Sequence, residues 1–280
     1  MKSNLTIHCV VKNEERWIWY ALQSILDIAD KVLVFDTGSS DKTVDIIKAM
    51  KSKKVTFEEK GEVDAKGLTK LREEQLRRTK TDWFLILDGD EIWPNQTKKE
   101  LVEKIKNADK SKWGVVVRAW NFVGDIYHYH PESVRYHWPF APKDYKGWAN
   151  LRVLRKSVIS DIKGDYPLEA YCDKNETPIQ NYGPKHLLFL KNRYMHTTYL
   201  TRSDSRKSDK DVLNRLRKSK MELGISFPKS FKYPEVFYKN RPNQVMTPWV
   251  KRFNLETLVS FIQTPAREAR RKIFNLYNPR

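Results

Sequence analysis

The stretch Trp83–Pro94 reads WFLILDGDEIWP, and the rest of the predicted fold is built around it. Five apolar residues, Trp83–Leu87, run without interruption and are followed at once by the acidic segment Asp88–Glu91. A short apolar run that ends in turn residues is typical of a strand buried on both faces. In an open α/β sheet, ligands bind just beyond the carboxyl ends of such strands. The stretch therefore predicts a core strand with a candidate binding site at its end.

Three carboxylates follow this strand, from Asp88, Asp90 and Glu91. They would repel one another unless a positive charge lies among them. Mg²⁺ and Mn²⁺ take oxygen ligands and are commonly bound by one or two carboxylates together with substrate phosphates. Gly89 lets the backbone turn tightly between the two aspartates. An isolated acid-Gly-acid tripeptide is more often a solvated acidic turn, so the metal interpretation depends on the rest of the chain.

The composition bounds the class of protein. With 280 residues and 40 % hydrophobic content, the chain has enough apolar material for one large domain, or for one domain and a smaller appendage. Its only two cysteines, Cys9 and Cys172, exclude a disulfide framework and a cysteine-based zinc site. The N-terminal segment lacks the apolar core of a secretory signal, and no window reaches the roughly 18 apolar residues of a membrane span. We therefore expect a cytoplasmic protein.

The net charge of +18 is concentrated near the C-terminus. The segment Lys191–Arg280 carries 21 Lys and Arg against 7 Asp and Glu. Such a basic tail favours an anionic partner, which could be nucleic acid, an anionic membrane surface or a phosphorylated substrate. A highly charged surface without a dedicated partner is the alternative that composition leaves open.

Buried strands and amphipathic helices alternate through the first 110 residues. The strands are predicted at Leu5–Val11, Lys31–Phe35, Val55–Phe57 and Trp83–Leu87, and helices are predicted after Asn13, from Asp41, over Asp64–Thr79 and over Lys98–Asn107. Asn13 is expected to cap the first helix. This alternation predicts an α/β fold with a parallel sheet and right-handed crossovers. The polar strand ends at Asn13-Glu14, Asp36 and Asp88–Glu91 should then converge on one edge of the sheet.

The pattern changes after residue 110. Trp113–Phe122 and Leu151–Arg155 are predicted strands, Asp165–Tyr171 is a predicted loop, and the segment up to Gly147 is rich in His, Tyr, Trp and Pro. Aromatic loops suit a sugar, whose apolar faces stack on rings, and equally suit a lid without ligand contact. His128, His130 and His137 match no zinc spacing. The lone His196 could reach a metal at the sheet edge, which its spacing does not decide.

The C-terminal part is predicted as helices at Asp209–Leu223, Trp249–Gln263 and Pro265–Tyr277. The last two combine apolar and basic residues, which is typical of helices that lie on an anionic bilayer and also of helices that dock on a protein core. We expect a catalytic domain over residues 1–200 and a basic helical extension over residues 201–280.

In three blocks the sequence resembles the family 2 glycosyltransferases, which are inverting enzymes of the GT-A fold. The blocks are VVKNEE at Val10–Glu15, VLVFDTGSSDKT at Val32–Thr43 and WFLILDGDE at Trp83–Glu91, in that order and spacing. The resemblance covers the first 95 residues well and weakens toward residue 200. It implies a Rossmann-like, mostly parallel central sheet flanked by helices.

The resemblance also implies roles for particular residues. The residues implied to bind the nucleotide-sugar are Val11, Asn13, Glu14, Asp36, Arg72, Asp88 and Gly89, with Asp36 accepting a hydrogen bond from the base, typically uracil. Many relatives have an Arg followed closely by an Asn at the position of Arg72, and here Glu74 replaces that Asn. Asp90 would bind Mn²⁺ or Mg²⁺, with Asp88 facing the ribose or the metal and His196 as the third ligand. Glu169, in DYPLEAY, would be the catalytic base.

The implied reaction moves a sugar from a nucleotide-sugar, typically a UDP-sugar, to an acceptor hydroxyl in one inverting displacement. A nucleotidyltransferase is the alternative enzyme, although VVKNEERW lacks the glycine-rich phosphate loop that such enzymes usually need. A non-catalytic nucleic-acid-binding protein would explain the basic charge but not the acidic strand ends, which repel phosphates. For the acceptor, our hypothesis is a lipid-linked or cell-surface glycan at the cytoplasmic face of the membrane.

Overall fold

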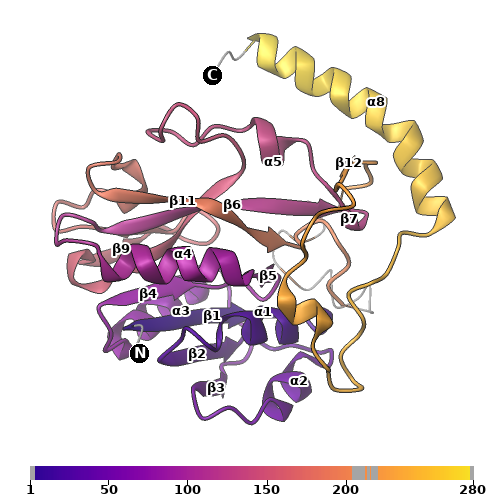
Figure 1. The fold of residues 1–280 in the computed structure, drawn as a ribbon. Coiled ribbons are helices and arrows are strands. Elements are labelled where there is room, and N and C mark those ends of the chain that lie inside the picture. The colour runs from indigo at the N-terminus through magenta and orange to yellow at the C-terminus, as the bar shows by residue number, and fades with distance from the viewer. Residues whose placement is uncertain (1–3, 204–211, 213–214, 216–219, 278–280) are drawn as a thin grey trace.

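The structure, a computed structural model, describes residues 4–203, 212, 215 and 220–277 of the chain. In Figure 1 the N-terminal strands, in indigo and purple, occupy the lower half of the molecule, and the later strands, in magenta and orange, occupy the upper half. The long C-terminal helix, in yellow, lies along the upper right rim. The sheet therefore joins two halves that are built from successive parts of the chain.

The first half of the sheet is parallel, in the order β3-β2-β1-β4. Its strands are β1 (Leu5–Val11), β2 (Lys31–Asp36), β3 (Val55–Glu59) and β4 (Trp83–Ile86), with β1 between β2 and β4. All four strands are found where the sequence predicts them. Because they run in the same direction, their carboxyl ends meet at one edge.

Helices follow the predicted alternation. They are α1 (Ile18–Ile25), α2 (Thr43–Ala49), α3 (Ala65–Arg78) and α4 (Asn95–Lys106). The start of α3 is capped by Asp64, whose carboxylate accepts a hydrogen bond of 2.7 Å from the backbone N–H of Gly67. This bond satisfies one of the amide groups that the first helical turn leaves without a partner.

Asn13 does not cap a helix, contrary to the prediction. Its φ angle is +53°, and α1 begins only at Ile18. Its side-chain Oδ1 accepts a bond of 2.7 Å from the backbone N–H of Ser40, while its own N–H donates to Oγ of Ser39 at 2.8 Å. Asn adopts such left-handed angles more readily than most residues because its short side chain bonds locally. Asn13 thereby ties the end of β1 to the loop after β2.

The second half of the sheet is mixed. Its strands are β5 (Glu91–Ile92), β6 (Gly114–Val123), β7 (Asp125–Tyr129), β8 (Ala149–Arg155), β11 (Leu187–His196) and β12 (Ile225–Ser226). Of these, β5, β7 and β8 run opposite to the others. β8 pairs antiparallel with both β4 and β6, and β11 pairs parallel with β6. The strands β6 and β11 consequently run in the direction of β1–β4. The predicted α/β fold with a mostly parallel sheet is confirmed.

Short elements complete this half. They are α5 (Glu132–Arg135), the 3₁₀ helices η1 (Lys156–Val158), η2 (Ile179–Asn181) and η3 (Glu235–Tyr238), and a separate pair of strands, β9 (Asp161–Lys163) and β10 (Ala170–Cys172). The predicted loop Asp165–Tyr171 connects β9 to β10 and runs into the latter. In η3, Val236 and Phe237 are buried in the main hydrophobic core together with residues of β1 and α1.

The end of β11 returns the chain to the acidic turn. β11 pairs antiparallel with β5, so that His196 lies opposite Glu91. The next residue, Thr197, donates its backbone N–H to the backbone carbonyl of Asp90 at 2.9 Å. These bonds join residues about 105 positions apart in the sequence, and they hold His196 beside the segment Asp88–Glu91.

The C-terminal helices differ from their prediction. One continuous helix, α8 (Asn254–Tyr277), replaces the two predicted at Trp249–Gln263 and Pro265–Tyr277. Pro265 lies inside α8, where it lacks the amide proton for an intrahelical bond, and a proline normally breaks or kinks a helix at such a position. Of the predicted helix Asp209–Leu223, residues 209–211, 213–214 and 216–219 lie outside the described residues, and the described end, residues 220–223, is not helical, contrary to the prediction. Within the described part of the chain, no helix is both long enough and apolar enough to cross a bilayer.

Candidate active site

A pocket of about 640 Å³ opens at the edge where β1, β4 and β11 end. Both halves of the sheet and the segment after β11 contribute to its lining. The lining residues include Val11, Glu14, Arg72, Asp88, Gly89, Asp90, Trp148, Arg152, Tyr166, Glu169, His196, Tyr199, Arg202, Arg215 and Lys220. Of the site residues predicted from the sequence, Asn13 and Asp36 are not part of the described lining. All the others are.

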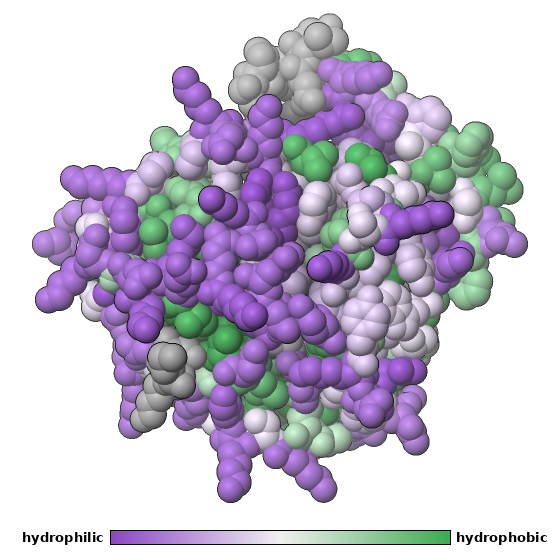
Figure 2. All heavy atoms as spheres, viewed as in Figure 1, coloured by the Kyte–Doolittle hydropathy of each residue, from purple (hydrophilic) through white to green (hydrophobic). Residues whose placement is uncertain are grey.

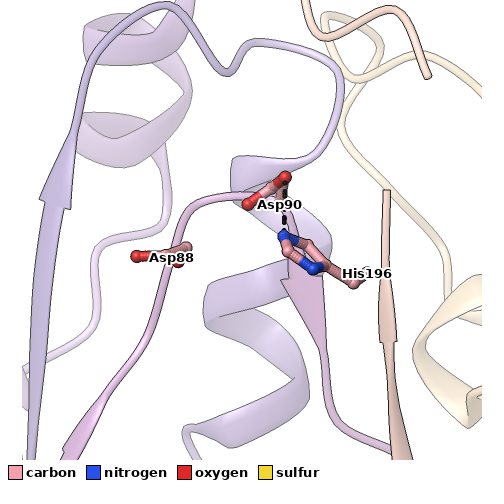
Figure 3. A group of neighbouring side chains, drawn as sticks. All are labelled: Asp88, Asp90 and His196. Atoms are coloured by element: carbon pink, nitrogen blue, oxygen red, sulfur yellow. Dashed lines mark ion pairs between the residues drawn. The ribbon is translucent and has the colours of Figure 1, made fainter. Parts of the chain in front are cut away.

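Asp88, Asp90 and His196 form a compact cluster in this pocket. One potential ligand atom from each lies within 4.8 Å of the other two. Figure 3 shows the imidazole of His196 pointing to the carboxylate of Asp90, with Asp88 on the preceding part of the same turn. The His196 Nε2 atom is 3.2 Å from Oδ2 of Asp90. The tertiary structure thus joins the two aspartates to a histidine that the sequence left undecided.

The donor atoms of this cluster fit a divalent cation. Two carboxylates and one imidazole offer oxygen and nitrogen ligands, and sites of this kind suit Mg²⁺ and Mn²⁺ when substrate oxygens complete the coordination. Asp90 is 1 % exposed, so its charge needs a compensating cation close by. The three residues could therefore hold the metal that the sequence predicts.

Gly89 is required by close packing at the turn. A Cβ atom on this residue would lie 2.9 Å from Cγ of Glu14 and 3.1 Å from Cγ2 of Val11. Real Cβ atoms essentially never come as close as the first of these distances. The missing side chain lets the acidic turn lie directly against the end of β1, inside the pocket.

Arg202 and Arg215 neutralise the acidic edge, and sequence reasoning missed both. Arg202 Nη1 donates to Oε1 of Glu14 at 2.7 Å, and its Nη2 lies 3.0 Å from Oδ2 of Asp90. Arg215 Nη2 donates to the same Glu14 oxygen at 2.5 Å. Burial raises the pKa of Glu14 to about 7, although the two guanidinium groups lower it. The pocket is therefore lined by interleaved positive and negative charges.

Arg152 in β8 compensates the other side of the acidic turn, and sequence reasoning missed it as well. Its Nη2 donates to Oδ2 of Asp88 at 2.8 Å and also to Oε1 of Glu91. Burial pushes the pKa of Asp88 upward, but Arg152 and Arg72 outweigh that effect, so the pKa of Asp88 is lowered. Asp88 consequently stays ionised, as a metal ligand must be. Glu91 is fully buried, and burial raises its pKa to about 8.

Arg72 and Glu169 meet across the pocket. The Nε atom of Arg72, in α3, is 2.9 Å from Oε1 of Glu169, in the loop before β10. The second carboxylate oxygen of Glu169 is buried and has no hydrogen-bond partner among the described residues. Glu74, which replaces the Asn of many relatives, pairs instead with Lys60 and Arg78. Glu169 is thus oriented by Arg72 and retains one oxygen for another partner.

Asp36 is used to shape a neighbouring loop. Its Oδ2 accepts bonds of 3.0 Å from the backbone N–H groups of Gly38 and Ser39, and its Oδ1 accepts from Oγ of Ser39 at 2.5 Å. With Asn13 bonded to Ser39 and Ser40, the two predicted nucleotide-binding residues hold the same loop. Their implied contacts with a nucleotide stay predictions.

Comparison with known proteins identifies the family. The family described as Glycosyl transferase family 2 matches residues 6–157, which is more than half of the chain. The chain belongs to this family. The predicted GT-A type fold agrees with this membership and with the mostly parallel sheet.

Individual relatives of this family 2 protein match less of it. An uncharacterized glycosyltransferase of Rickettsia bellii is 32 % identical over 106 residues, which cover 38 % of this chain and 33 % of the relative. The chain therefore matches about a third of the length of that curated relative. Residues 1–349 of TarS from S. aureus give a TM-score of 0.44 at 15 % identity, over 76 % of this chain and 71 % of that TarS fragment. The mannosyltransferase PcManGT from Pyrobaculum calidifontis, solved with GDP-Man and Mn²⁺, gives a TM-score of 0.38 at 20 % identity, over 55 % of this chain and 45 % of PcManGT.

Proposed function

We propose that this protein transfers a sugar from a nucleotide-sugar, a UDP-sugar, to an acceptor hydroxyl, with metal dependence and with inversion at the anomeric carbon. The observation that carries the proposal is the cluster of Asp88, Asp90 and His196 in a pocket that also holds Arg202 and Arg215. The carboxylates can bind a cation, and the neighbouring guanidinium groups can bind phosphate oxygens. Together they match the chemistry of a diphosphate bound to a metal.

The donor is proposed to bind between the ends of β1 and β4. Val11, Glu14, Gly89 and Arg72 line this part of the pocket. Asn13, just after β1, and Asp36, at the end of β2, are proposed to act on the nucleotide beside the loop that they hold. Because Gly89 has no side chain, a ligand could approach the backbone of the acidic turn closely.

Asp88, Asp90 and His196 are proposed to hold Mn²⁺ or Mg²⁺. Such a cation, when bound, stabilises the negative charge that develops on the leaving diphosphate. Arg202 and Arg215 supply further positive charge on the same side of the pocket, and hydrogen bonds to charged groups are about twice as strong as neutral ones. Donor binding would exchange their contacts with Glu14 and Asp90 for contacts with phosphate oxygens.

Glu169 is proposed to accept the proton of the attacking hydroxyl. A general base must lie within hydrogen-bond reach of that proton, and typical rate contributions are about 10²–10⁴-fold. The buried Glu169 oxygen that has no hydrogen-bond partner in the described part of the chain supports this role. Arg72, at 2.9 Å from the other oxygen, would keep the carboxylate in position. Trp148, Tyr166 and Tyr199 offer rings on which a sugar could stack.

The acceptor is proposed to be a lipid-linked or cell-surface glycan, used at the cytoplasmic face of a membrane. The support for this part of the proposal is the basic charge of the C-terminal segment, since anionic lipid attracts Lys and Arg.

Calorimetric titration of UDP, with and without Mn²⁺, tests the donor and the metal together. We expect binding that requires Mn²⁺ and that the Asp90→Ala variant loses. Asp109→Ala is the matched control, because Asp109 is exposed and lies outside the pocket lining. If UDP and the other nucleoside diphosphates fail to bind under any metal condition, the proposed function is wrong.

A further inference from the structure

The C-terminal helix α8 packs on the molecule through its polar side. Ser260 is buried and Gln263, Thr264, Arg267 and Arg271 are partly buried, at a spacing that puts them on one face of the helix. An amphipathic helix on a soluble protein normally turns its apolar stripe toward the core. In α8 the orientation is reversed.

Specific bonds fix this orientation. Glu222, which is 2 % exposed, lies 2.7 Å from Nη1 of Arg271 and 3.3 Å from Nη1 of Arg267, one carboxylate oxygen for each arginine. Thr264 Oγ1 accepts a bond of 3.0 Å from the backbone N–H of Leu223. Without these arginines the buried carboxylate would face the His130 imidazole, whose Nε2 is 3.5 Å from Oε1 of Glu222, in place of two full positive charges, which is unfavourable. The helix therefore keeps its polar side on the core.

The opposite side of α8 exposes large apolar side chains. Their exposed fractions are 72 % for Leu255, 57 % for Leu258, 66 % for Phe261, 68 % for Ile262 and 55 % for Ile273. In Figure 2, hydrophobic residues gather on the right-hand rim of the molecule, where α8 lies in Figure 1. Contiguous exposed apolar surface of this kind marks a site of interaction with a partner or a membrane.

The charges beside this apolar side favour a lipid surface over a second copy of the chain. Arg270 and Lys272 are exposed and lie two positions apart, which corresponds to about 200° around the helix. They therefore lie toward opposite borders of the apolar side. Lys251, just before α8, is exposed as well. Lys and Arg in these positions extend to anionic headgroups while the apolar side enters the boundary of the acyl chains. Two copies facing each other would bring like charges together.

We propose that α8 docks in the plane of an anionic phospholipid bilayer, with Leu258, Phe261 and Ile262 inserted at the boundary between headgroups and acyl chains. Glu222, which anchors α8, lies two residues from Lys220 in the pocket lining. Docking would thus present the pocket to acceptors carried by the bilayer. The statement that docking presents the pocket to acceptors rests on the proposed glycosyltransferase function. The docking of α8 on the bilayer does not depend on that function.

Co-sedimentation of the full chain with vesicles tests the docking. The vesicles contain equal parts of phosphatidylcholine and phosphatidylglycerol, with pure phosphatidylcholine as the uncharged comparison. We expect the wild-type protein to sediment with the anionic vesicles, and the triple variant Leu258→Gln, Phe261→Gln, Ile262→Gln to lose at least about tenfold in vesicle affinity. Phe140→Gln is the matched control, since Phe140 is 60 % exposed elsewhere on the surface. Its vesicle binding should equal that of the wild type.

Equal sedimentation of the triple variant and the wild type would overturn the proposal, as would a wild-type protein that stays in solution. A wild-type dimer that the triple variant converts to a monomer would identify a second copy as the occupant and would also overturn it. UDP titration of the same variants separates the two proposals. Vesicle binding without UDP binding refutes the transferase function alone, and UDP binding without vesicle binding refutes the docking alone.

Discussion

The guanidinium of Arg202 lies 3.0 Å from the carboxylate of Asp90, the residue proposed as the central metal ligand. The same guanidinium bonds Glu14 at 2.7 Å, so a single cation holds the ends of β1 and β4 together. A metal ion and Arg202 would compete for the charge of Asp90. This competition leads to the first prediction.

Arg202→Met should bind Mn²⁺ alone more tightly than the wild type and bind UDP in the presence of Mn²⁺ more weakly. The first effect follows from the freed Asp90 carboxylate. The second follows from the loss of a charged hydrogen bond worth about 1.5–3 kcal/mol, which corresponds to roughly ten- to a hundredfold in affinity. Calorimetry with each ligand measures both effects. Arg77→Met, at a side chain that is 69 % exposed, should change neither, and an unaltered UDP affinity in Arg202→Met would contradict the prediction.

Gly89→Ala should weaken binding of both Mn²⁺ and UDP by more than about tenfold. The added methyl group would meet Glu14 Cγ at 2.9 Å and push the acidic turn away from β1. Overpacking of this kind also costs about 1–3 kcal/mol of unfolding free energy, which urea titration would detect. Gly183→Ala is the control, because its Cβ would have 3.7 Å to the nearest atom, an ordinary contact. Wild-type binding in Gly89→Ala would refute the packing argument.

Glu169→Gln should lower kcat by about 10²–10⁴-fold and leave UDP affinity within about twofold. The amide keeps the shape of the carboxylate but cannot accept the hydroxyl proton. Glu176→Gln, at a side chain that is 74 % exposed, should retain full activity. Should Glu169→Gln lose UDP binding instead of turnover, its role would be to position Arg72 rather than to act as a base.

His8 should lower the stability of the folded chain in mild acid, and this effect opposes that of Glu14 and Glu91, whose raised pKa values favour the folded state there. The His8 ring stacks on Phe84 with 4.6 Å between centroids, and its Nε2 is 2.6 Å from Oγ1 of Thr79. Burial, assisted by the charges of Arg72 and Lys156, lowers the pKa of His8 from 6.5 to about 3. The unfolded chain takes up this proton below pH 6.5, whereas the folded chain does not. The stability that neutral His8 contributes above pH 6.5 is therefore lost progressively as the pH falls toward 3. At pH 5 the loss is about 2 kcal/mol.

Urea unfolding at pH 7 and pH 5 checks this expectation. Relative to the wild type, His8→Gln should gain about 2 kcal/mol of stability from pH 7 to pH 5, because it has no proton to gain in the unfolded state, while Glu14 and Glu91 act equally in both proteins. His137→Gln, at an exposed histidine, should keep the wild-type dependence. Identical pH dependence in His8→Gln and the wild type would show that His8 is not the group responsible.

Local sequence determined the N-terminal half of the sheet and the acidic turn. Strands such as Trp83–Ile86 are short runs whose apolar character alone requires burial, and parallel strands bring their ends to one edge whatever the details of packing. Asp88, Asp90 and Glu14 could therefore be expected to meet. The helix cap predicted at Asn13 failed because Asn also suits left-handed turns, and nearby residues do not distinguish the two uses.

Only the tertiary structure decided which cations meet these acids and which side of α8 is covered. Arg152, Arg202 and Arg215 are ordinary basic residues in the sequence, and they reach Asp88, Asp90 and Glu14 only because the fold closes long chain separations. The pattern of α8 shows that it is amphipathic but does not say which side faces the core. Glu222, buried beneath the helix, settles that through its two arginines, because a buried charge must be paired whereas an apolar side chain can remain exposed.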